Sequence, residues 1–509
     1  MPLEDYRELL RLCRLCGNCR QSGTTYHGIC PAGERFGFDA YYSRGRAIIA
    51  QKLLDEEMAW ATPVAEVVYR CTMCGGCVEQ CPVEYRDHIL AIFLALRREC
   101  LERRLISPAV KTYLETVYAY GNPWKARREQ RGDWAVGTAI KHYEPADEFL
   151  YYVGCVGSYD PRGMQVARAV GNVLLAAGVS FGILGNEEGC DGNEARLLGE
   201  EGLFEYLAAG NSQTFQRLHV RRIVTLSPHS YHVMRHEYPR FGAGVEVNHY
   251  TQVLRDLLAA GRLDLSRKFP RRVTYHDPCF LGRQNGEYDA PRAVLQRIPG
   301  LELVEMPRNR ENSFCCGGGA GNFYAGALDG TDRSPGRIRI REAREAGAEL
   351  VAVACPSCMT MLEDAAKVEG LEERLAVKDI AEIVQEAMAE KPRRAAAGGR
   401  LTQRTVTVGR MIGQINRHVP RDGFAAASLP PPRSCNRWHA PRLQLCSVCV
   451  METQERASFS QVAGAAGFGT GDAQSKERVS PGRFHWLGEE EEGKPCHGVT
   501  ERGRLDGGR

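Results

Sequence analysis

Phe314-Cys315-Cys316-Gly317-Gly318-Gly319 is a poor sequence for packing a core but a suitable one for holding a metal cluster. Adjacent cysteines rarely pair with each other, because disulfide geometry is specific and a bond between neighbours is strained. The glycines allow positive φ angles and close backbone approach, as a bulky inorganic cluster requires. Cys279 lies upstream, and Cys355-Pro356-Ser357-Cys358 lies downstream. Five thiols exceed the four ligands of one zinc ion or one cubane, so the pattern predicts a large iron–sulfur site rather than cysteines buried in an ordinary core.

The set Cys279, Cys315-Cys316-Gly317 and Cys355-x-x-Cys358 resembles the cysteine-rich domain of heterodisulfide reductases. The same domain occurs in the iron–sulfur subunits of glycolate oxidase and anaerobic glycerol-3-phosphate dehydrogenase. The resemblance implies that these five cysteines are a catalytic site that holds a noncubane [4Fe–4S] cluster, where disulfide chemistry occurs. His276 and Asp277 are either proton donors beside this site or residues that structure its loop.

The length of 509 residues allows several domains, and the composition, 43% hydrophobic and 25% charged, is typical of soluble globular proteins. The first residues, Met1 to Arg7, lack the apolar run of a signal peptide. The apolar run from Ile89 to Leu96 is far shorter than the roughly 20 residues that span a bilayer. We therefore expect a cytoplasmic protein, with peripheral attachment to the inner face of the cell membrane through a partner as the alternative.

Twenty cysteines without a secretory signal favour metal binding over a disulfide framework. Residues 1–392 carry 48 basic and 52 acidic side chains, a net charge of −4, whereas residues 393–509 carry 18 and 11, a net charge of +7. The mildly acidic balance of the first part argues against nucleic acid as a partner.

Residues 1–105 contain two cysteine runs of the ferredoxin type. In this pattern three cysteines bind one [4Fe–4S] cubane, and the fourth, which precedes a proline, binds the other. One predicted ligand set is Cys13, Cys16, Cys19 and Cys81; the other is Cys71, Cys74, Cys77 and Cys30. A pair of zinc-binding loops is the alternative, although zinc sites more often use paired C-x-x-C units. Predicted helices over 44–58 and 86–105 and the long linker between the runs indicate an α-helical ferredoxin module.

Residues 106–147 are expected to be a connector, because Ser107-Pro108 and Gly121-Asn122-Pro123 are turn signals. The charged run from Lys125 to Arg131 is expected to be a solvated face, with contact to a partner flavoprotein as the alternative.

Residues 148–268 and 269–392 are predicted to be two copies of one domain. Tyr151–Cys155 resembles Thr274–Cys279, Glu188–Gly192 resembles Ser313–Gly317, and Val224–Ser230 resembles Ala352–Cys358, at offsets of 124, 125 and 128 residues. A nearly constant offset indicates a repeat. Predicted strands over 149–153, 223–226 and 350–354 and predicted helices over 164–177 and 380–390 indicate α/β layers.

The first copy has lost three of the five thiols, which are replaced by Asp191, Ser227 and Ser230, while Cys155 and Cys190 remain. Two thiolates cannot hold the same cluster, so this degenerate copy is predicted to be structural. Binding of a metal by Asp191, His229 or His232 is the alternative.

Residues 393–509 show no lasting periodicity and are predicted to be a disordered, low-complexity tail. A zinc knuckle formed by Cys435, Cys446-x-x-Cys449 and Cys496-His497 is the alternative for this segment. The predicted fold class is thus α+β multidomain: a helical ferredoxin module, two α/β cysteine-rich domains and a tail.

The predicted function is that of an iron–sulfur subunit of a heterodisulfide reductase-like oxidoreductase. Two [4Fe–4S] cubanes would carry electrons to or from the five-cysteine site. One alternative is a non-catalytic relay between a flavoprotein dehydrogenase or electron-transfer flavoprotein and a quinone or membrane subunit, and another is a redox sensor or scaffold. The glycines at 317–321 lack the pattern of a dinucleotide site, so any flavin is expected on a partner chain.

Overall fold

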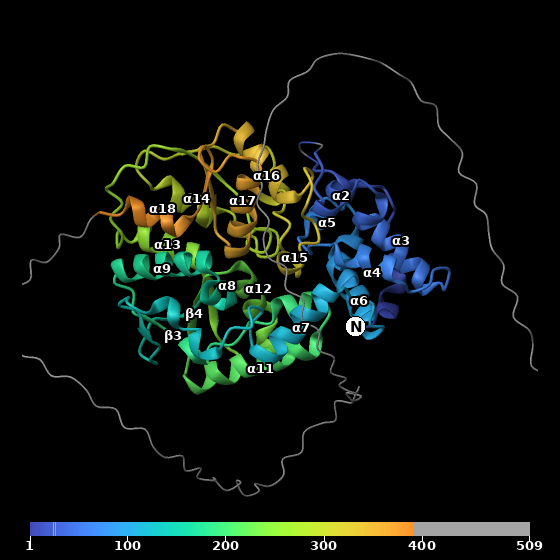
Figure 1. Cartoon of the computed structure of the whole chain (residues 1–509), viewed down its shortest axis with the longest axis horizontal. Helices are drawn as coiled ribbons and strands as arrows, with labels where there is room; N and C mark the ends of the chain where they lie inside the picture. Colours follow the sequence, from blue (N-terminus) through green and yellow to red (C-terminus); the bar gives the residue numbers. More distant parts are fainter. Residues whose placement is uncertain (24, 26, 390–509) are drawn as a thin grey trace, which may run out of the picture. The chain divides into compact units, whose positions relative to one another are not determined.

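The computed structural model describes residues 1–23, 25 and 27–389. The predictions for the tail at 393–509, including the zinc-knuckle alternative, lie outside the described residues. Figure 1 gives the labels of the helices and strands used below.

The first 105 residues are mainly helical. The helices are α1 (Arg7–Leu10), α2 (Pro31–Phe36), α3 (Ser43–Leu54), α4 (Thr62–Tyr69), α5 (Gly76–Glu79) and α6 (Ile89–Glu102), with 3-10 turns η1 (Leu3–Tyr6), η2 (Asn18–Arg20), η3 (Asp39–Tyr41) and η4 (Glu84–His88). The helices α3 and η4–α6 confirm the predicted helices over 44–58 and 86–105, although α3 ends four residues early. It ends there because Glu56 adopts a left-handed φ of 57°, which a continuing helix does not allow. This part therefore is a helical ferredoxin-type module.

The segment expected to be a connector contains a helix, α7 (Pro108–Tyr120), that the sequence analysis did not predict. The helix begins at Ser107 and Pro108, the two residues that the sequence analysis interpreted as a turn signal. Ser107 accepts a hydrogen bond from the N–H of Val110, and Pro108 occupies the first turn. The turns η5 (Arg128–Gln130) and η6 (Asp133–Ala135) follow.

The prediction that the charged run is a solvated face is wrong for its last residue. Arg131 is only 2% exposed, and its guanidinium lies 2.9 Å from the carboxylate of Glu188. The pairing partner is 57 residues away in the sequence, so the charge pattern of the run alone does not reveal it.

Two parallel sheets follow, one in each predicted copy. The first contains β1 (Lys141–His142), β2 (Phe149–Tyr152), β3 (Phe181–Ile183), β4 (Arg222–Thr225) and β5 (Glu246–His249) in the order β1-β3-β2-β4-β5. The second contains β6 (Arg272–Tyr275), β7 (Glu302–Leu303), β8 (Leu350–Val353) and β9 (Ala376–Asp379) in the order β7-β6-β8-β9. Four strands thus recur in the same order, which confirms the repeat; β1 is an additional edge strand.

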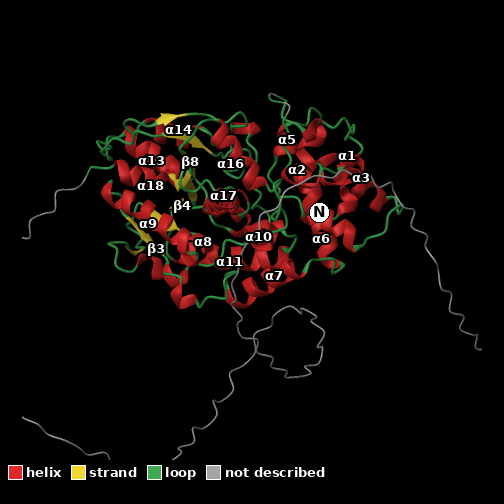
Figure 2. Cartoon of the chain, turned by 45° about the horizontal axis from the view of Figure 1, so that its top comes forward, coloured by secondary structure: helices red, strands yellow, loops and turns green. Residues whose placement is uncertain are grey.

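Helices surround the short strands of both sheets, as Figure 2 shows. The first copy has α8 (Gly154–Tyr159), α9 (Pro161–Ala176), η7 (Gly185–Glu187), α10 (Asn193–Leu197), α11 (Glu201–Arg217), α12 (Pro228–His236), η8 (Tyr238–Phe241) and α13 (Tyr250–Ala259). The second has α14 (Asp289–Gln296), η9 (Arg310–Asn312), α15 (Asn322–Ala325), α16 (Pro335–Glu345), α17 (Pro356–Val368) and α18 (Ile380–Ala387). The central strands β2 and β8 are buried along their whole length, as expected for parallel sheets covered on both faces.

The two copies pack against each other through helices α9, α13, α14 and α18. The hydroxyl of Tyr250, at the start of α13, donates a 2.7 Å hydrogen bond to Asp379, which caps α18. Arg162 of α9 lies 2.6 Å from carboxylate oxygens of both Glu363 and Glu382. Within the described part of the chain, we find no helix with the length and apolar character needed to cross a membrane.

Candidate metal centres

The second sheet brings three of the five predicted cysteines to one edge. Strands β6 and β8 are parallel neighbours, so their carboxyl ends meet there. Cys279 follows β6 after a short loop, and Cys355 follows β8 directly and precedes α17. Cys358 lies in the first turn of that helix. The topology of the repeat therefore explains why cysteines so far apart in sequence gather.

The loop after η9 adds the adjacent pair. The Sγ atom of Cys316 lies 3.4 Å from that of Cys358, and the Sγ atom of Cys315 lies 4.0 Å from that of Cys279. Gly317 has a φ of 98°, a left-handed conformation that glycine adopts without strain. All five thiols are buried, none more than 6% exposed. The structure thus gathers the five thiols in one buried group, the five-cysteine pocket.

The pKa values of the gathered thiols diverge strongly. Contacts from the thiols of Cys315 and Cys358 lower the pKa of Cys316, whereas contacts with Cys316 and Cys355 raise the pKa of Cys358. Such a pocket cannot accept five thiolates without a compensating cation. A purely thiol donor set that encloses more than four sulfurs fits an iron–sulfur cluster and is too large for one zinc ion.

His276 borders the same pocket. One of its ring nitrogens lies within 4.8 Å of the Sγ atoms of Cys316 and Cys358. Its Nδ1 accepts a 3.2 Å hydrogen bond from Arg339, so Nε2 carries the proton of the neutral ring, and Nε2 has no hydrogen-bond partner among the described residues. Burial lowers the pKa of His276 to about 3.

Asp277, in contrast, structures the loop. Its two carboxylate oxygens lie 2.6 and 2.9 Å from the guanidinium of Arg292, and one of them accepts the backbone N–H of Arg310. Three hydrogen bonds and the ion pair with Arg292 thus hold the carboxylate in place, which favours the loop-structuring interpretation over that of a proton donor.

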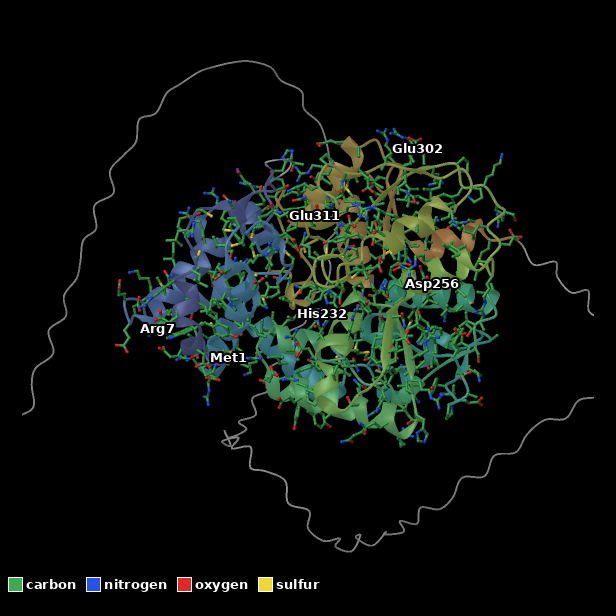
Figure 3. The ribbon with its side chains drawn as sticks, turned by 180° about the vertical axis from the view of Figure 1, so that it is seen from behind. Met1, Arg7, His232, Asp256, Glu302 and Glu311 are labelled. Atoms are coloured by element: carbon green, nitrogen blue, oxygen red, sulfur yellow. The ribbon has the colours of Figure 1, made fainter. Side chains whose placement is uncertain are left out.

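The N-terminal cysteines form two further groups. Cys30, Cys71, Cys74 and Cys77 line a single cavity of about 20 Å³. In the other group, burial raises the pKa of Cys13, and the nearby thiols of Cys81 and Cys16 raise it further. Burial likewise raises the pKa of Cys19 to about 12. Figure 3, with sulfur in yellow, shows sulfur atoms among the blue N-terminal helices. The structure thus brings together the cysteines of each predicted four-cysteine set, and their role as ligands stays a prediction.

The three groups of thiols follow one another. The thiol of Cys30 acts electrostatically on that of Cys19, which relates the first group to the second. The thiol of Cys315 raises the pKa of the Cys74 thiol, which relates the second group to the five-cysteine pocket. Cys16, in the first group, is exposed. A series of thiols therefore leads from the surface to the buried pocket.

The loop that holds Cys315 and Cys316 approaches the ferredoxin module closely at Gly319. A Cβ atom at Gly319 would lie 2.7 Å from the carbonyl oxygen of Thr72, closer than real Cβ contacts. Arg283 supports the same junction, because its Nε donates to the carbonyl of Cys74 at 2.8 Å and its guanidinium also donates to the carbonyl of Ser313.

The first copy has a cavity of about 50 Å³ at the equivalent edge. Among the residues that line it are the five equivalents of the cluster cysteines: Cys155, Cys190, Asp191, Ser227 and Ser230. Ser230 donates a 2.5 Å hydrogen bond to Asp191, and Ser227 accepts the N–H of His229 at the start of α12. The three replaced positions thus satisfy one another or the backbone.

Comparison with known proteins places this architecture in a family. Residues 149–235 and 273–363 match the model of the cysteine-rich domain, and residues 9–85 match that of a 4Fe-4S dicluster domain. The chain is 30% identical over 395 residues to the D subunit of the dihydromethanophenazine:CoB–CoM heterodisulfide reductase of Methanosarcina barkeri, covering 74% of this chain and 94% of that protein. The chain belongs to the family of heterodisulfide reductase D subunits.

Two longer proteins are also similar to this heterodisulfide reductase D-type chain. One is a probable iron-sulfur-binding oxidoreductase, FadF, of Bacillus subtilis, with 35% identity over 335 residues, 64% of this chain and 47% of that protein. The other is an EtfAB:quinone oxidoreductase of Syntrophomonas wolfei, with 35% identity over 355 residues, 66% of this chain and 48% of that protein. The chain therefore spans about half the length of these two relatives.

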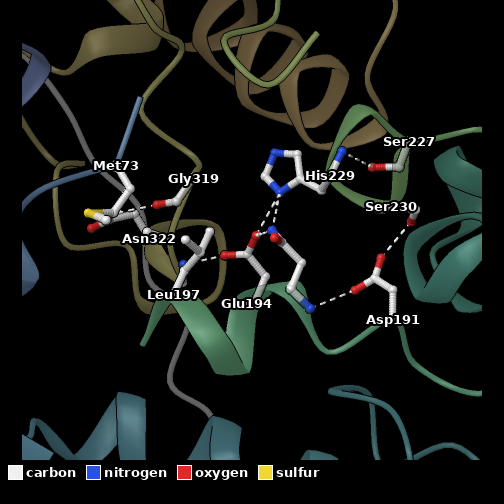
Figure 4. Close-up of polar contacts among 12 residues, drawn as sticks. Met73, Asp191, Glu194, Leu197, Ser227, His229, Ser230, Gly319 and Asn322 are labelled. Atoms are coloured by element: carbon white, nitrogen blue, oxygen red, sulfur yellow. Dashed lines mark hydrogen bonds and ion pairs between the residues drawn. The ribbon is translucent and has the colours of Figure 1, made fainter. Parts of the chain in front are cut away.

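In this heterodisulfide reductase D-type chain, the first copy also contributes a side chain to the second. The ring of His229 lies beside Cys355 of the five-cysteine pocket, and the Cys355 thiol helps to raise the pKa of His229. Its Nδ1 lies 2.6 Å from Oε1 of Glu194, and the other oxygen of Glu194 accepts the backbone N–H of Gly321 (Figure 4). Burial alone would lower the pKa of His229, but the hydrogen bonds to Cys355 and Glu194 outweigh it and raise this pKa.

Sequence reasoning considered His229 only as a ligand for the first copy and missed Glu194, Arg283 and Arg339 altogether. The repeat offset contains one usable signal, since His229 is the equivalent of Ser357, between Cys355 and Cys358. The partners of the two arginines are mostly backbone carbonyls and a histidine nitrogen, and these have no sequence signature.

Proposed function

We propose that this chain is an iron–sulfur oxidoreductase subunit that carries electrons between a surface-exposed donor site and the five-cysteine pocket. The observation that carries the proposal is the series of thiols from exposed Cys16 to buried Cys315, joined through Cys74. Iron–sulfur clusters supply one-electron transfer when bound, with potentials set by charge, hydrogen bonds to sulfur and exposure.

The proposed ligand sets keep the sequence assignments. One [4Fe–4S] cubane is held by Cys13, Cys16, Cys19 and Cys81, and the other by Cys71, Cys74, Cys77 and Cys30. A noncubane [4Fe–4S] cluster is held by Cys279, Cys315, Cys316, Cys355 and Cys358. The match to a 4Fe-4S dicluster domain supports the two cubanes over the zinc alternative.

The chain's own residues have three tasks at the noncubane site. The surrounding core excludes water from all five thiols. Arg339 fixes His276 as the tautomer with its proton on Nε2, a hydrogen-bond donor at the border of the pocket. His229 contacts the sulfur of Cys355 from the other copy. Hydrogen bonds of this kind stabilise negative charge on sulfur and so raise a reduction potential.

We propose a flavoprotein dehydrogenase or an electron-transfer flavoprotein as the donor, near Cys16. The name of the Syntrophomonas wolfei relative, an EtfAB:quinone oxidoreductase, supports this proposal. It equally favours the second candidate function, a non-catalytic relay to a quinone or membrane subunit. In either case we propose a cytoplasmic location or attachment to the inner membrane face through that partner.

One experiment distinguishes the two candidates. The full chain, purified without oxygen, is reduced with dithionite and freed of excess reductant. It is then mixed either with a mixed disulfide of two different thiols or with a quinone. Disulfide reductase function predicts that the disulfide reoxidises the protein and that Cys358→Ser abolishes this while the cubanes remain reducible. Reoxidation by the quinone alone, undiminished in Cys358→Ser, would instead establish the relay and reject disulfide chemistry.

A further inference from the structure

The first cysteine-rich copy retains two cysteines that contact each other. Cys155 lies at the start of α8, directly after β2, and Cys190 lies in the loop before α10. Cys155 and Cys190 line the same cavity, and each thiol shifts the pKa of the other. Their equivalents in the second copy, Cys279 and Cys315, lie 4.0 Å apart through their Sγ atoms. The repeat has therefore kept the juxtaposition of two thiols while losing the other three.

A buried cation stands beside one of the two thiols. The Nη1 atom of Arg131 lies 3.5 Å from Sγ of Cys155. The rest of the guanidinium is held in place, because Nε and Nη2 donate to Glu188 at 3.2 and 2.9 Å and Nη2 also donates to the carbonyl of Gly189 at 2.8 Å. Arginine keeps its charge at any physiological pH. Arg131 is thus a fixed donor that stabilises a thiolate on Cys155.

The two thiols differ in character. The hydrogen bond from Cys190 lowers the pKa of Cys155, and Arg131 lowers it further, against the opposing effect of burial. The contact with Cys155 and burial raise the pKa of Cys190. Both thiols line the 50 Å³ cavity, but Cys155 is half-buried whereas Cys190 is only 6% exposed. One accessible thiolate beside one protected thiol is the arrangement of a pair that performs thiol–disulfide exchange.

We propose that Cys155 and Cys190 form a redox-active dithiol that exchanges with low-molecular-weight disulfides, separate from the iron–sulfur pocket. The Sγ atom of Cys155 attacks one sulfur of the external disulfide, whose S–S bond breaks. One thiolate leaves and takes up a proton, and a mixed disulfide remains on Cys155. Cys190 then loses its proton, attacks Sγ of Cys155 and expels the second thiolate. One external disulfide becomes two thiols, and a Cys155–Cys190 disulfide forms.

The exchange site adjoins the five-cysteine pocket. Its cavity is also lined by Gly318, Pro356 and Ser357, which neighbour Cys316, Cys355 and Cys358 in sequence. A change in the redox state of the dithiol therefore takes place next to the loops that hold the five cysteines. The proposal itself rests only on contacts within residues 131–190 and stands if the proposed electron-transfer function fails.

The test uses the iron-loaded full chain under anaerobic conditions. It is equilibrated with glutathione buffers of increasing oxidised fraction, quenched in acid, alkylated and mapped by mass spectrometry. A Cys155–Cys190 disulfide should accumulate without loss of iron. In the Cys190→Ser variant the reaction should end with a glutathione adduct on Cys155. In the Cys155→Ser variant Cys190 should stay unmodified. Arg131→Gln should slow adduct formation severalfold, because it removes the cation that stabilises the thiolate of Cys155.

Cys100→Ser, at a buried cysteine of α6, is the matched control and should behave as wild type. Two results would overturn the proposal. In one, both thiols of the wild-type chain stay reduced across the whole series of buffers. In the other, Cys190→Ser or Cys155→Ser loses iron, which would make the two cysteines metal ligands.

Discussion

His229 of the first cysteine-rich copy lies 2.6 Å, through its Nδ1, from Oε1 of Glu194, and the same ring lies beside Cys355 of the second copy. The other oxygen of Glu194 accepts the N–H of Gly321, in the loop that follows Cys315-Cys316. The first copy therefore supports the five-cysteine pocket from outside. This role explains physically why a copy that has lost three thiols is still packed against the intact one.

His229→Gln should lower the reduction potential of the five-cysteine centre. A hydrogen bond to a charged group contributes about 1.5–3 kcal/mol, and a difference of about 1 kcal/mol between the two redox states corresponds to a shift on the order of 40 mV. The two cubane potentials should not move. Redox titration followed by electron paramagnetic resonance measures all three.

His232→Gln is the control for this change, because His232 also packs against Phe280 but binds Asn285 rather than a cysteine. Equal shifts in both variants, or a shift of the cubanes in His229→Gln, would remove the specific role of His229.

Gly319→Ala should separate the ferredoxin module from the five-cysteine loop. The new Cβ would lie 2.7 Å from the carbonyl oxygen of Thr72, which is backbone and cannot turn aside. We expect a loss of about 1–3 kcal/mol in stability, read as a lower thermal midpoint. Electron transfer between cubanes and pocket should also slow in stopped-flow measurements.

Gly318→Ala provides the matched comparison, since its Cβ would lie 3.0 Å from the flexible side chain of Met361. Its thermal midpoint should fall less. An alanine at 319 that is tolerated as well as one at 318 would contradict the proposed close approach.

Asp379→Asn should stabilise the protein increasingly as pH rises. Burial raises the pKa of Asp379 from 3.8 to about 8, against hydrogen bonds from Ala381 and Tyr250. The folded chain thus holds this proton more tightly than the unfolded chain, and ionising the carboxyl costs stability as pH rises from about 4 to about 8. Asparagine keeps an oxygen to cap α18 but does not titrate.

The measurement is the difference in thermal midpoint between Asp379→Asn and wild type across this pH range. It should grow toward pH 8 and then level off, whereas Asp256→Asn, at an exposed carboxylate, should show no such trend. A difference independent of pH would show that burial does not shift this carboxyl.

Most of the groups of thiols could be predicted from the sequence, because they arise from short cysteine spacings or from the domain repeat. A C-x-x-C-x-x-C run keeps three thiols within one short loop, and the repeat offset relates Cys279 to Cys155 without any knowledge of packing. The contact of His229 with Cys355 depends on how two copies pack, which no spacing encodes. Likewise Arg131 belongs to an exposed-looking charged run, and only the fold brings it to Glu188 and Cys155.

Iron content per chain, measured with the electron paramagnetic resonance spectrum on anaerobically purified full-length protein, tests the central claim most directly. Wild type should contain about twelve irons, from two cubanes and one four-iron cluster. Cys315→Ser should contain about eight and lose one paramagnetic signal, with both cubane signals intact. About eight irons in wild type, or equal iron and identical spectra in the two proteins, would contradict a cluster in the five-cysteine pocket.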